Sequence, residues 1–311
     1  YTASGGGALS IWTWGFDKFY KLFNPRQLLT LVKLVKLLRE VGKQAEEEKR
    51  QGGWSPEDAL RYAEAVITYL SIALIRYADY NTLCTVWNYG GQLPAQVAHT
   101  LSMRGIAMMW NWGDVSPFAE MSGTGTFFMN LQKISKTMVY LTNALHGSSN
   151  TIRAECDDAT TLVRLKEDDR VDLIVTDPPY RDDVPYAELS DFYYVWLKRA
   201  LSDVKDIGGV LIRVPRFHEE AFFKDGLEIE TQWKRLAPRE VSEDESRARF
   251  FGGNVGSFEY FKELLSASFR TMADLLKDDG ILATYYAHTS PDAWEAVSYT
   301  HLRAHETEAD L

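Results

Sequence analysis

The segment that most constrains how this chain folds is an apolar run, "VDLIVT" at residues 171–176, which stops at an aspartate followed by two prolines. Beyond Asp172 the run shows no alternation of polar and apolar side chains, a pattern typical of parallel sheets covered on both faces. A second such strand, "ILATYYAH" at residues 281–288, follows a helix that is predicted over residues 257–280 and ends at a glycine. Strands separated by helices indicate an α/β fold with a mostly parallel sheet.

Helices are predicted upstream of this sheet. An Asn-Pro pair opens an amphipathic helix over residues 24–50, and a Ser-Pro pair opens a second one over residues 55–81. The glycines between them predict a helical hairpin. Residues 84–128 are rich in Trp, Gly, Pro and Asn, so we expect loops and short elements there, followed by a helix over residues 127–146.

Shorter elements complete the prediction. "TIRAEC" at residues 151–156 is predicted to be a strand, and "DDATTLVRL" at residues 157–165 a turn and a short helix. Residues 203–254 form a long polar insertion. The last fifteen residues, "VSYTHLRAHETEADL", resemble translated sequencing adapters, and we expect a non-native tail there. We therefore expect three parts: a helical and Trp/Gly-rich segment at residues 1–128, an α/β region at residues 129–296, and this tail at residues 297–311.

The charge balance restricts how the chain can bind nucleic acid. With 311 residues and 45% hydrophobic side chains it can bury a substantial core, but its formal net charge is −10. Contacts with phosphates therefore require a local basic patch. Five arginines are candidates for that patch, with a solvated insertion as the alternative for most of them: Arg213, Arg216, Arg239, Arg247 and Arg249.

Cysteine and histidine usage indicates the compartment. The two cysteines lack CxxC spacing, which favours a reducing compartment and argues against a disulfide scaffold. Among the histidines, only His301 and His305 lie one helical turn apart. Because both belong to the expected non-native tail, we predict no metal site. We find no signal peptide or membrane-spanning run and expect a cytoplasmic protein without membrane contacts.

The residues after the apolar run suit a specific chemistry. Ligands of open parallel sheets bind beyond the carboxyl ends of the strands, where Asp177, Pro178, Pro179 and Tyr180 are expected. Prolines are harmless there because no ladder bond is needed, and they stiffen the turn. A carboxylate, a backbone carbonyl and an aromatic ring together suit binding of the exocyclic amine of a planar base. The alternative is a common Pro-terminated strand with an Asp-containing turn.

This "DPPY" resembles the catalytic motif of amino-methyltransferases that use S-adenosylmethionine to form N6-methyladenine or N4-methylcytosine in DNA. The resemblance implies that Asp177 and the Pro178 carbonyl bind the target amine of a base flipped out of double-stranded DNA, while Tyr180 stacks on that base. Over most of residues 20–295 the chain is similar to the large bacterial and archaeal adenine-specific DNA methylases that carry a zinc ribbon ("FNPRQLL", "RYADYN", "MMWNWGDVSPF", "MADLLKDDGILATYYAH"). The resemblance therefore implies a Rossmann-like class I methyltransferase fold preceded by a helical segment, in an enzyme that acts on adenine N6.

The resemblance also assigns further residues. An acidic residue after the preceding strand commonly binds the adenine end of the cofactor, which makes Asp158 the candidate and Asp157 the alternate; a helix N-cap is their other possible role. Thr176 is a further candidate for binding the cofactor. The candidates for binding the substrate are Arg181, Asp183 and Tyr186. A solvated turn is the alternative for Asp183.

One part of the family pattern does not match. The glycine-rich turn that approaches the cofactor has no counterpart, because "MSGTGTFF" at residues 121–128 follows no apolar strand. In the zinc-ribbon subfamily this turn and the ribbon precede the part that resembles this chain. We therefore expect an incomplete fold that binds S-adenosylmethionine weakly or not at all by itself. The alternatives are methylation of cytosine N4, of RNA or of a protein amide, and a nucleic-acid-binding module without catalysis. Relatives that act on proteins usually carry Asn where this chain has Asp177.

Overall fold

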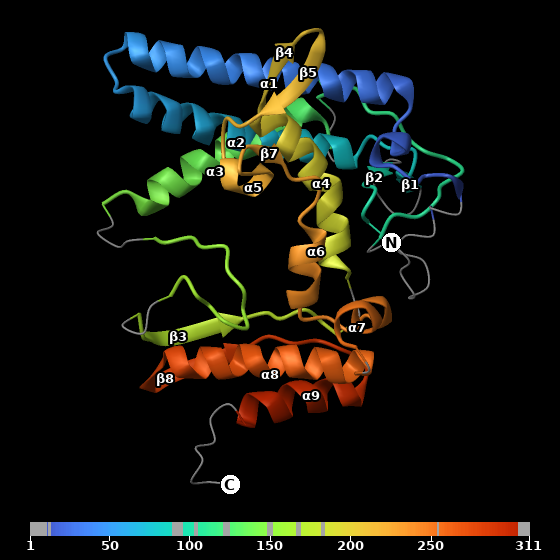
Figure 1. The fold of residues 1–311 in the computed structure, drawn as a ribbon, viewed down its shortest axis with the longest axis vertical. Coiled ribbons are helices and arrows are strands. Elements are labelled where there is room, and N and C mark those ends of the chain that lie inside the picture. The colour runs from blue at the N-terminus through green and yellow to red at the C-terminus, as the bar shows by residue number, and fades with distance from the viewer. Residues whose placement is uncertain are drawn as a thin grey trace. The chain divides into compact units, whose positions relative to one another are not determined.

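The computed structural model describes residues 11, 14–88, 96–102, 105–120, 125–147, 152–165, 169–181, 184–253 and 255–303 (Figure 1). The helices, with η for 3-10 helices, are η2 (Phe19–Leu22), α1 (Pro25–Gln51), α2 (Pro56–Asp79), α3 (Phe127–Leu145), α4 (Tyr186–Leu201), α5 (Glu219–Phe222), α6 (Trp233–Leu236), η3 (Ala237–Arg239), α7 (Glu245–Phe251), α8 (Ser257–Leu275) and α9 (Pro291–Arg303). The strands are β1 (Val86–Asn88), β2 (Gln96–Ala98), β3 (Val171–Thr176), β4 (Asp203–Ile207), β5 (Val210–Val214), β6 (Phe223–Lys224), β7 (Leu227–Glu228) and β8 (Leu276–Thr284).

The chain divides into two compact units. Among the described residues, the hairpin unit comprises those from 11 to 147 and from 189 to 232, and the sheet unit comprises those from 152 to 188 and from 233 to 303. Each unit is discontinuous in sequence, unlike the contiguous parts expected from the sequence. The difference arises because the predicted insertion contributes to both units: β4 to β7 belong to the hairpin unit, and α6 to α7 to the sheet unit.

The predicted helical hairpin is confirmed in the hairpin unit. Asn24 caps α1 through a reciprocal pair of hydrogen bonds, in which the Gln27 backbone N–H donates to Asn24 Oδ1 (2.8 Å) and the Asn24 N–H donates to Gln27 Oε1 (2.9 Å). Ser55 caps α2 through its hydroxyl, which accepts from the Asp58 N–H at 3.1 Å, without the reciprocal backbone bond. The two start signals in the sequence are therefore local capping motifs.

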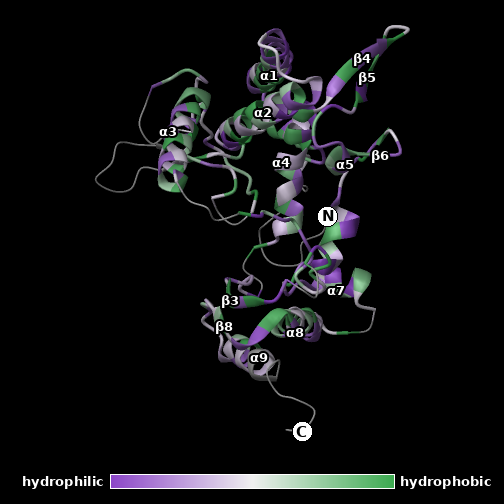
Figure 2. Ribbon diagram, turned by 90° about the vertical axis from the view of Figure 1, so that its left-hand side faces the viewer, coloured by the Kyte–Doolittle hydropathy of each residue, from purple (hydrophilic) through white to green (hydrophobic). Residues whose placement is uncertain are grey.

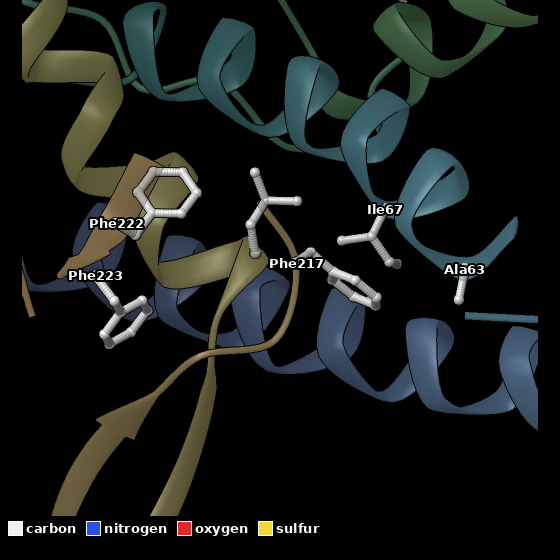
Figure 3. Close-up of a cluster of buried hydrophobic side chains, with 6 residues drawn as sticks. Ala63, Ile67, Phe217, Phe222 and Phe223 are labelled. Carbon is white, nitrogen blue, oxygen red and sulfur yellow. The ribbon is translucent and has the colours of Figure 1, made fainter. Parts of the chain in front are cut away.

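An apolar cluster joins the hairpin to the following segments (Figure 3). Its fully or nearly fully buried members come from α2, α4 and the β5-to-β6 region: Ala63, Ile67, Leu201, Phe217, Phe222 and Phe223. Close packing at Gly42 supports the cluster, since a Cβ there would lie 2.9 Å from Ile67 Cγ1. The residues after the hairpin are thus part of a packed core.

The sheet unit contains the predicted apolar strand. β3 pairs with β8 in parallel, with Ile174 opposite Leu282 and Thr176 opposite Thr284. One face packs on α8 and α9, because Leu282 contacts the buried cluster formed by Val241, Phe261, Leu265, Phe269, Ala296 and Val297. The described residues therefore form a mixed α/β fold with a parallel pair of strands.

The expectation that both faces of the sheet are covered is wrong for the described part of the chain. Leu173 and Val175 share the second face of β3 and are each 58% exposed, and their neighbour Ile281 is 64% exposed. Figure 2 shows β3 as a strongly hydrophobic segment. Within the described residues, β3 and β8 pair only with each other.

Several predicted boundaries also differ. Residues 152–156 form an exposed segment with no strand, and residues 157–165 form turns with no helix. α8 ends at Leu275, five residues before the predicted end, because Leu276 already pairs with Val171. α9 includes residues 297–303 of the expected tail, and Val297 is buried against α8.

The described helices include none whose length and apolar character would suffice to cross a membrane.

Candidate functional site

The Asp-Pro-Pro-Tyr segment lies at the carboxyl end of β3, as its prolines predict. The parallel pairing with β8 continues to its edge, where the Tyr285 N–H donates to the Thr176 carbonyl at 2.8 Å. Asp177 is the first residue past the strand and is exposed. The carboxylate thus stands outside the hydrogen-bonded ladder, where a ligand can reach it.

A hydrogen bond closes the segment on itself. The Tyr180 hydroxyl donates to Asp177 Oδ1 at 2.7 Å. This bond, together with partial burial and the negative charge of Asp177, raises the pKa of Tyr180 above that of an ordinary tyrosine. Among the described residues, no other group donates to Asp177, so its second carboxylate oxygen and the remaining lone pair of the first are available to a ligand.

The backbone adds a second acceptor. The Pro179 carbonyl accepts from the Arg181 N–H at 3.1 Å, whereas within the described residues no donor contacts the Pro178 carbonyl. Asp177 and Pro178 therefore supply two adjacent acceptors that could take the two hydrogens of an amino group.

Aromatic rings border the segment. The Tyr180 ring meets Tyr286 edge to face, with centroids 5.5 Å apart and an interplanar angle of 89°. Tyr286 in turn meets Trp294 of α9 at 5.3 Å and 90°. An edge-to-face contact covers at most one face of the Tyr180 ring, and it fixes the plane of that ring.

Arg181 is committed to protein contacts. Its Nε pairs with the Glu243 carboxylate, its Nη1 donates to Ser290 Oγ at 3.1 Å, and its guanidinium lies 4.7 Å from the Phe258 ring centroid. Its carbonyl accepts from the Glu243 N–H at 2.9 Å. The residue adopts a left-handed conformation, with φ at 57°. These contacts hold the carboxyl end of the motif, and the predicted contact of Arg181 with substrate stays a prediction.

The two candidate cofactor residues form a turn. Asp157 Oδ2 accepts from the Arg164 N–H at 2.6 Å, and this bond lowers the pKa of Asp157. Asp158 Oδ1 accepts from the N–H and hydroxyl of Thr160, at 2.9 and 2.7 Å, while Oδ2 pairs with Arg239 at 3.2 Å. Both carboxylates are thus engaged by protein groups, although the turn does not lead into the helix that would make either an N-cap.

Tyr186 opens α4 and is 55% exposed. Its backbone N–H donates to Glu240 Oε1 at 3.0 Å, and the Ala187 N–H donates to Glu240 Oε2 at 2.7 Å. Glu240 therefore caps the start of α4 from a segment distant in sequence. Asp183 lies outside the described residues.

A buried ionic cluster, formed by Arg247, Glu188 and Glu240, supports this helix start. The Arg247 side chain is only 1% exposed and pairs with Glu188 Oε2, with Glu240 Oε1 at 3.1 Å and with Ser242 Oγ at 2.7 Å. Burial raises the pKa of Glu240, and the Arg247 charge only partly offsets this. Trp233 Nε1 also donates to Glu188 at 2.7 Å. Sequence reasoning missed this cluster, because its partners are separated by up to 59 residues.

The five arginines proposed for a phosphate patch do not form one set. Arg213 and Arg216 belong to the hairpin unit, while Arg239, Arg247 and Arg249 belong to the sheet unit. Arg247 is too buried to contact a phosphate, so that assignment is wrong. The other four pair with carboxylates, respectively those of Glu228, Glu46, Asp158 and Glu245.

Comparisons with protein-family models, with curated proteins and with solved structures find no match for this chain. The function of the site is therefore inferred from its geometry, which consists of two adjacent acceptors and a fixed aromatic ring at the end of a parallel strand.

Proposed function

We propose that this chain carries the base-binding site of an amino-methyltransferase acting on DNA in the cytoplasm, with adenine N6 as the target. The observation that carries the proposal is the pair of acceptors at Asp177 and Pro178 beside the Tyr180 ring, directly after a parallel strand. The Rossmann-like methyltransferase fold is part of the same proposal, supported by the parallel β3–β8 pair and the α8 helix that precedes β8.

The chemistry of the amine explains the acceptors. The nitrogen of an exocyclic amino group is a poor nucleophile because its lone pair is delocalised into the ring. Acceptors at Asp177 and the Pro178 carbonyl would take both hydrogens and localise the lone pair on nitrogen. The Tyr180 ring would hold the plane of the base, and Asp177 would stabilise the positive charge that develops on the nitrogen.

The family's methyl donor, S-adenosylmethionine, does not fit the described residues as they lie. Asp158, the candidate for its adenosine end, already accepts from Thr160 and pairs with Arg239, and its side chain is only 10% exposed. The Thr176 carbonyl is likewise used, by Tyr285. We therefore assign to the described residues only the binding of the target amine.

Labelled methyl transfer tests the proposal. The chain is incubated with unmethylated DNA and S-adenosylmethionine, and the nucleosides are separated. Asp177→Ala serves as the inactive variant, and Arg61→Gln, a change at an exposed arginine paired with Glu57, serves as the control. Label in N6-methyladenine that is lost only with Asp177→Ala supports the proposal, and it would also show that the donor binds despite the contacts of Asp158. Label in N4-methylcytosine would change the base. Label in RNA or protein but not in DNA would contradict it.

The engaged state of Asp158 favours one second candidate, a nucleic-acid-binding module without catalysis. A duplex carrying 2-aminopurine at the target position distinguishes the two, because its fluorescence rises when the base leaves the stack. A rise that depends on Asp177, without methyl transfer, would identify the module.

A further inference from the structure

Three arginines from different elements of the hairpin unit meet at the carboxyl end of α4. Arg39 of α1 donates from Nε to the Arg199 carbonyl at 2.9 Å. Arg213 of β5 donates from Nη1 to Ser202 Oγ, at 3.1 Å, just past the end of the same helix. Arg199 itself donates to the Val195 carbonyl at 2.9 Å. Together, Arg39, Arg199 and Arg213 form what we call the arginine cluster, and each is partly buried.

The arginine cluster has too little negative charge around it. Within the described residues, no carboxylate lies within salt-bridge distance of Arg39 or Arg199, and Glu228 at 3.4 Å from Arg213 is shared with Lys198 at 3.0 Å. The carboxyl end of α4 contributes only about half a negative charge. Three cations and a lysine are thus opposed by Glu228, by a helix end and, at longer range from Arg39, by Asp203, which also pairs with Lys43.

The electrostatic consequence is visible at two of the arginines. Burial, followed by the charges of Arg213 and Arg199, lowers the pKa of Arg39 to about 10, and the charge of Asp203 offsets this only in part. Burial and the charge of Arg213 also lower the pKa of Arg199. In addition, the only acceptor near the buried Arg213 Nε in the described part of the chain is Glu228 Oε1 at 3.4 Å, and this contact lacks hydrogen-bond geometry.

Neighbouring ion pairs do not relieve the surplus. Lys43 is neutralised by Asp203 at 3.0 Å, and Glu46 is shared between Arg50 and Arg216. This region is therefore positively charged, in a chain whose net charge is −10. Partly buried like charges destabilise a fold unless an anion compensates them.

We propose that the arginine cluster binds a phosphate group. Guanidinium groups match the oxygens of a phosphate in pairs, and three of them from α1, α4 and β5 would surround one tetrahedral anion. The phosphate belongs either to DNA or to a small phosphate ester, which share this chemistry. The proposal is independent of methyl transfer, since its residues lie in the hairpin unit.

The test compares Arg199→Gln with wild type by calorimetry and thermal denaturation, using inorganic phosphate against sodium chloride at equal ionic strength. Gln keeps a donor for the Val195 carbonyl but removes one repelling charge. The expected result is an unchanged or higher melting temperature for Arg199→Gln without phosphate, together with an affinity for phosphate that is weaker by about tenfold. Arg61→Gln, an exposed α2 residue paired with Glu57, should behave as wild type.

Further outcomes are decisive. Arg199→Lys keeps the charge but loses the paired donors, and it should bind phosphate with intermediate affinity. Binding of a DNA duplex is then measured at several salt concentrations. If the slope of log affinity against log salt concentration is smaller by about one in Arg199→Gln than in wild type, the phosphate comes from DNA; if the affinity for the duplex is unchanged, it comes from a small ester. No thermal response of wild type to phosphate, or an equal response of Arg199→Gln, would overturn the proposal.

Discussion

At the scale of single residues, Arg181 explains how the motif keeps its shape. A non-glycine residue in the left-handed region costs on the order of 1–3 kcal/mol, and Arg181 has a φ of 57°. Charged hydrogen bonds contribute about 1.5–3 kcal/mol each, so its bonds to Glu243 and Ser290 outweigh that cost. We regard Arg181 as a positioning residue that holds the loop containing Asp177 and Tyr180.

Replacing Arg181 should therefore destabilise the sheet unit. Arg181→Met is expected to lower the free energy of unfolding by about 2–4 kcal/mol, because Glu243, only 18% exposed, loses its cation. Urea denaturation followed by tryptophan fluorescence measures this change. Arg153→Met is the matched control, since Arg153 is also a loop arginine with acidic partners but is 50% exposed. Equal losses for both variants would show that the burial of Arg181 is unimportant.

The bond between Tyr180 and Asp177 makes a titration prediction. The pKa of Tyr180 is raised in the folded protein, so its contribution to stability is present below the ordinary tyrosine pKa and disappears as pH rises through the raised value. Asp177→Asn removes the carboxylate charge and should lower the pKa of Tyr180. Carbon NMR of tyrosines labelled at Cζ, assigned with Tyr180→Phe, measures it. An unchanged pKa in Asp177→Asn would exclude the bond.

The sequence predicts individual residues well where their partners are local. Asn24 and Ser55 were identifiable because each bonds to a residue three positions away. The contact between Arg181 and Glu243 spans 62 residues, and the engagement of Asp158 by Arg239 is also long-range. Neither contact leaves a local pattern, so the resemblance that made Arg181 and Asp158 candidates for substrate and cofactor gave no sign of these protein partners.

At the scale of elements, the same distinction separates correct from incorrect predictions. Helices α1, α2 and α3 carry their periodicity within their own residues and were predicted. The start of α4, in contrast, depends on Glu240, which lies more than 50 residues away in sequence. The strand expected at residues 151–156 needs a neighbouring strand; instead, Arg153 bonds to Glu155 and, at 2.6 Å, to the Arg164 carbonyl. These bonds tie the segment into a loop.

The buried ionic cluster allows a prediction about α4. Arg247→Met leaves Glu188 and Glu240 buried without a cation, which should lower the free energy of unfolding by about 3–5 kcal/mol at neutral pH. The pKa of Glu240 is already raised by burial, so protonation favours the folded state, and this contribution is lost as pH rises through the raised pKa. The deficit of Arg247→Met should therefore shrink as pH falls toward the ordinary carboxyl range.

Chemical denaturation at a series of pH values measures this deficit. Arg249→Met is the matched control, because Arg249 lies on the same helix, α7, but is 81% exposed and pairs with Glu245. Its effect should be small at every pH. A deficit of Arg247→Met that stays constant with pH would mean that the loss comes from packing and not from the uncompensated carboxylates.

At the scale of the whole molecule, the bare face of the β3–β8 sheet is the least expected feature. Parallel sheets are almost always covered on both faces, and a two-stranded sheet is marginal by itself. Here Leu173, Val175 and Ile281 share one exposed face. Within the described residues the outer edges of both strands are also unpaired, so this surface combines two features that promote association.

The chain should therefore associate with itself as its concentration rises, and a charge on the bare face should weaken that association. Leu173→Lys adds a charge at a position that is 58% exposed, so the fold should tolerate it. Sedimentation velocity over a concentration series measures the change. Leu227→Lys is the control. Leu227 is 75% exposed and lies on β7, which pairs with β6 and belongs to a different sheet from β3 and β8. Association that responds equally to both substitutions would show that general charge, and not the sheet face, controls it.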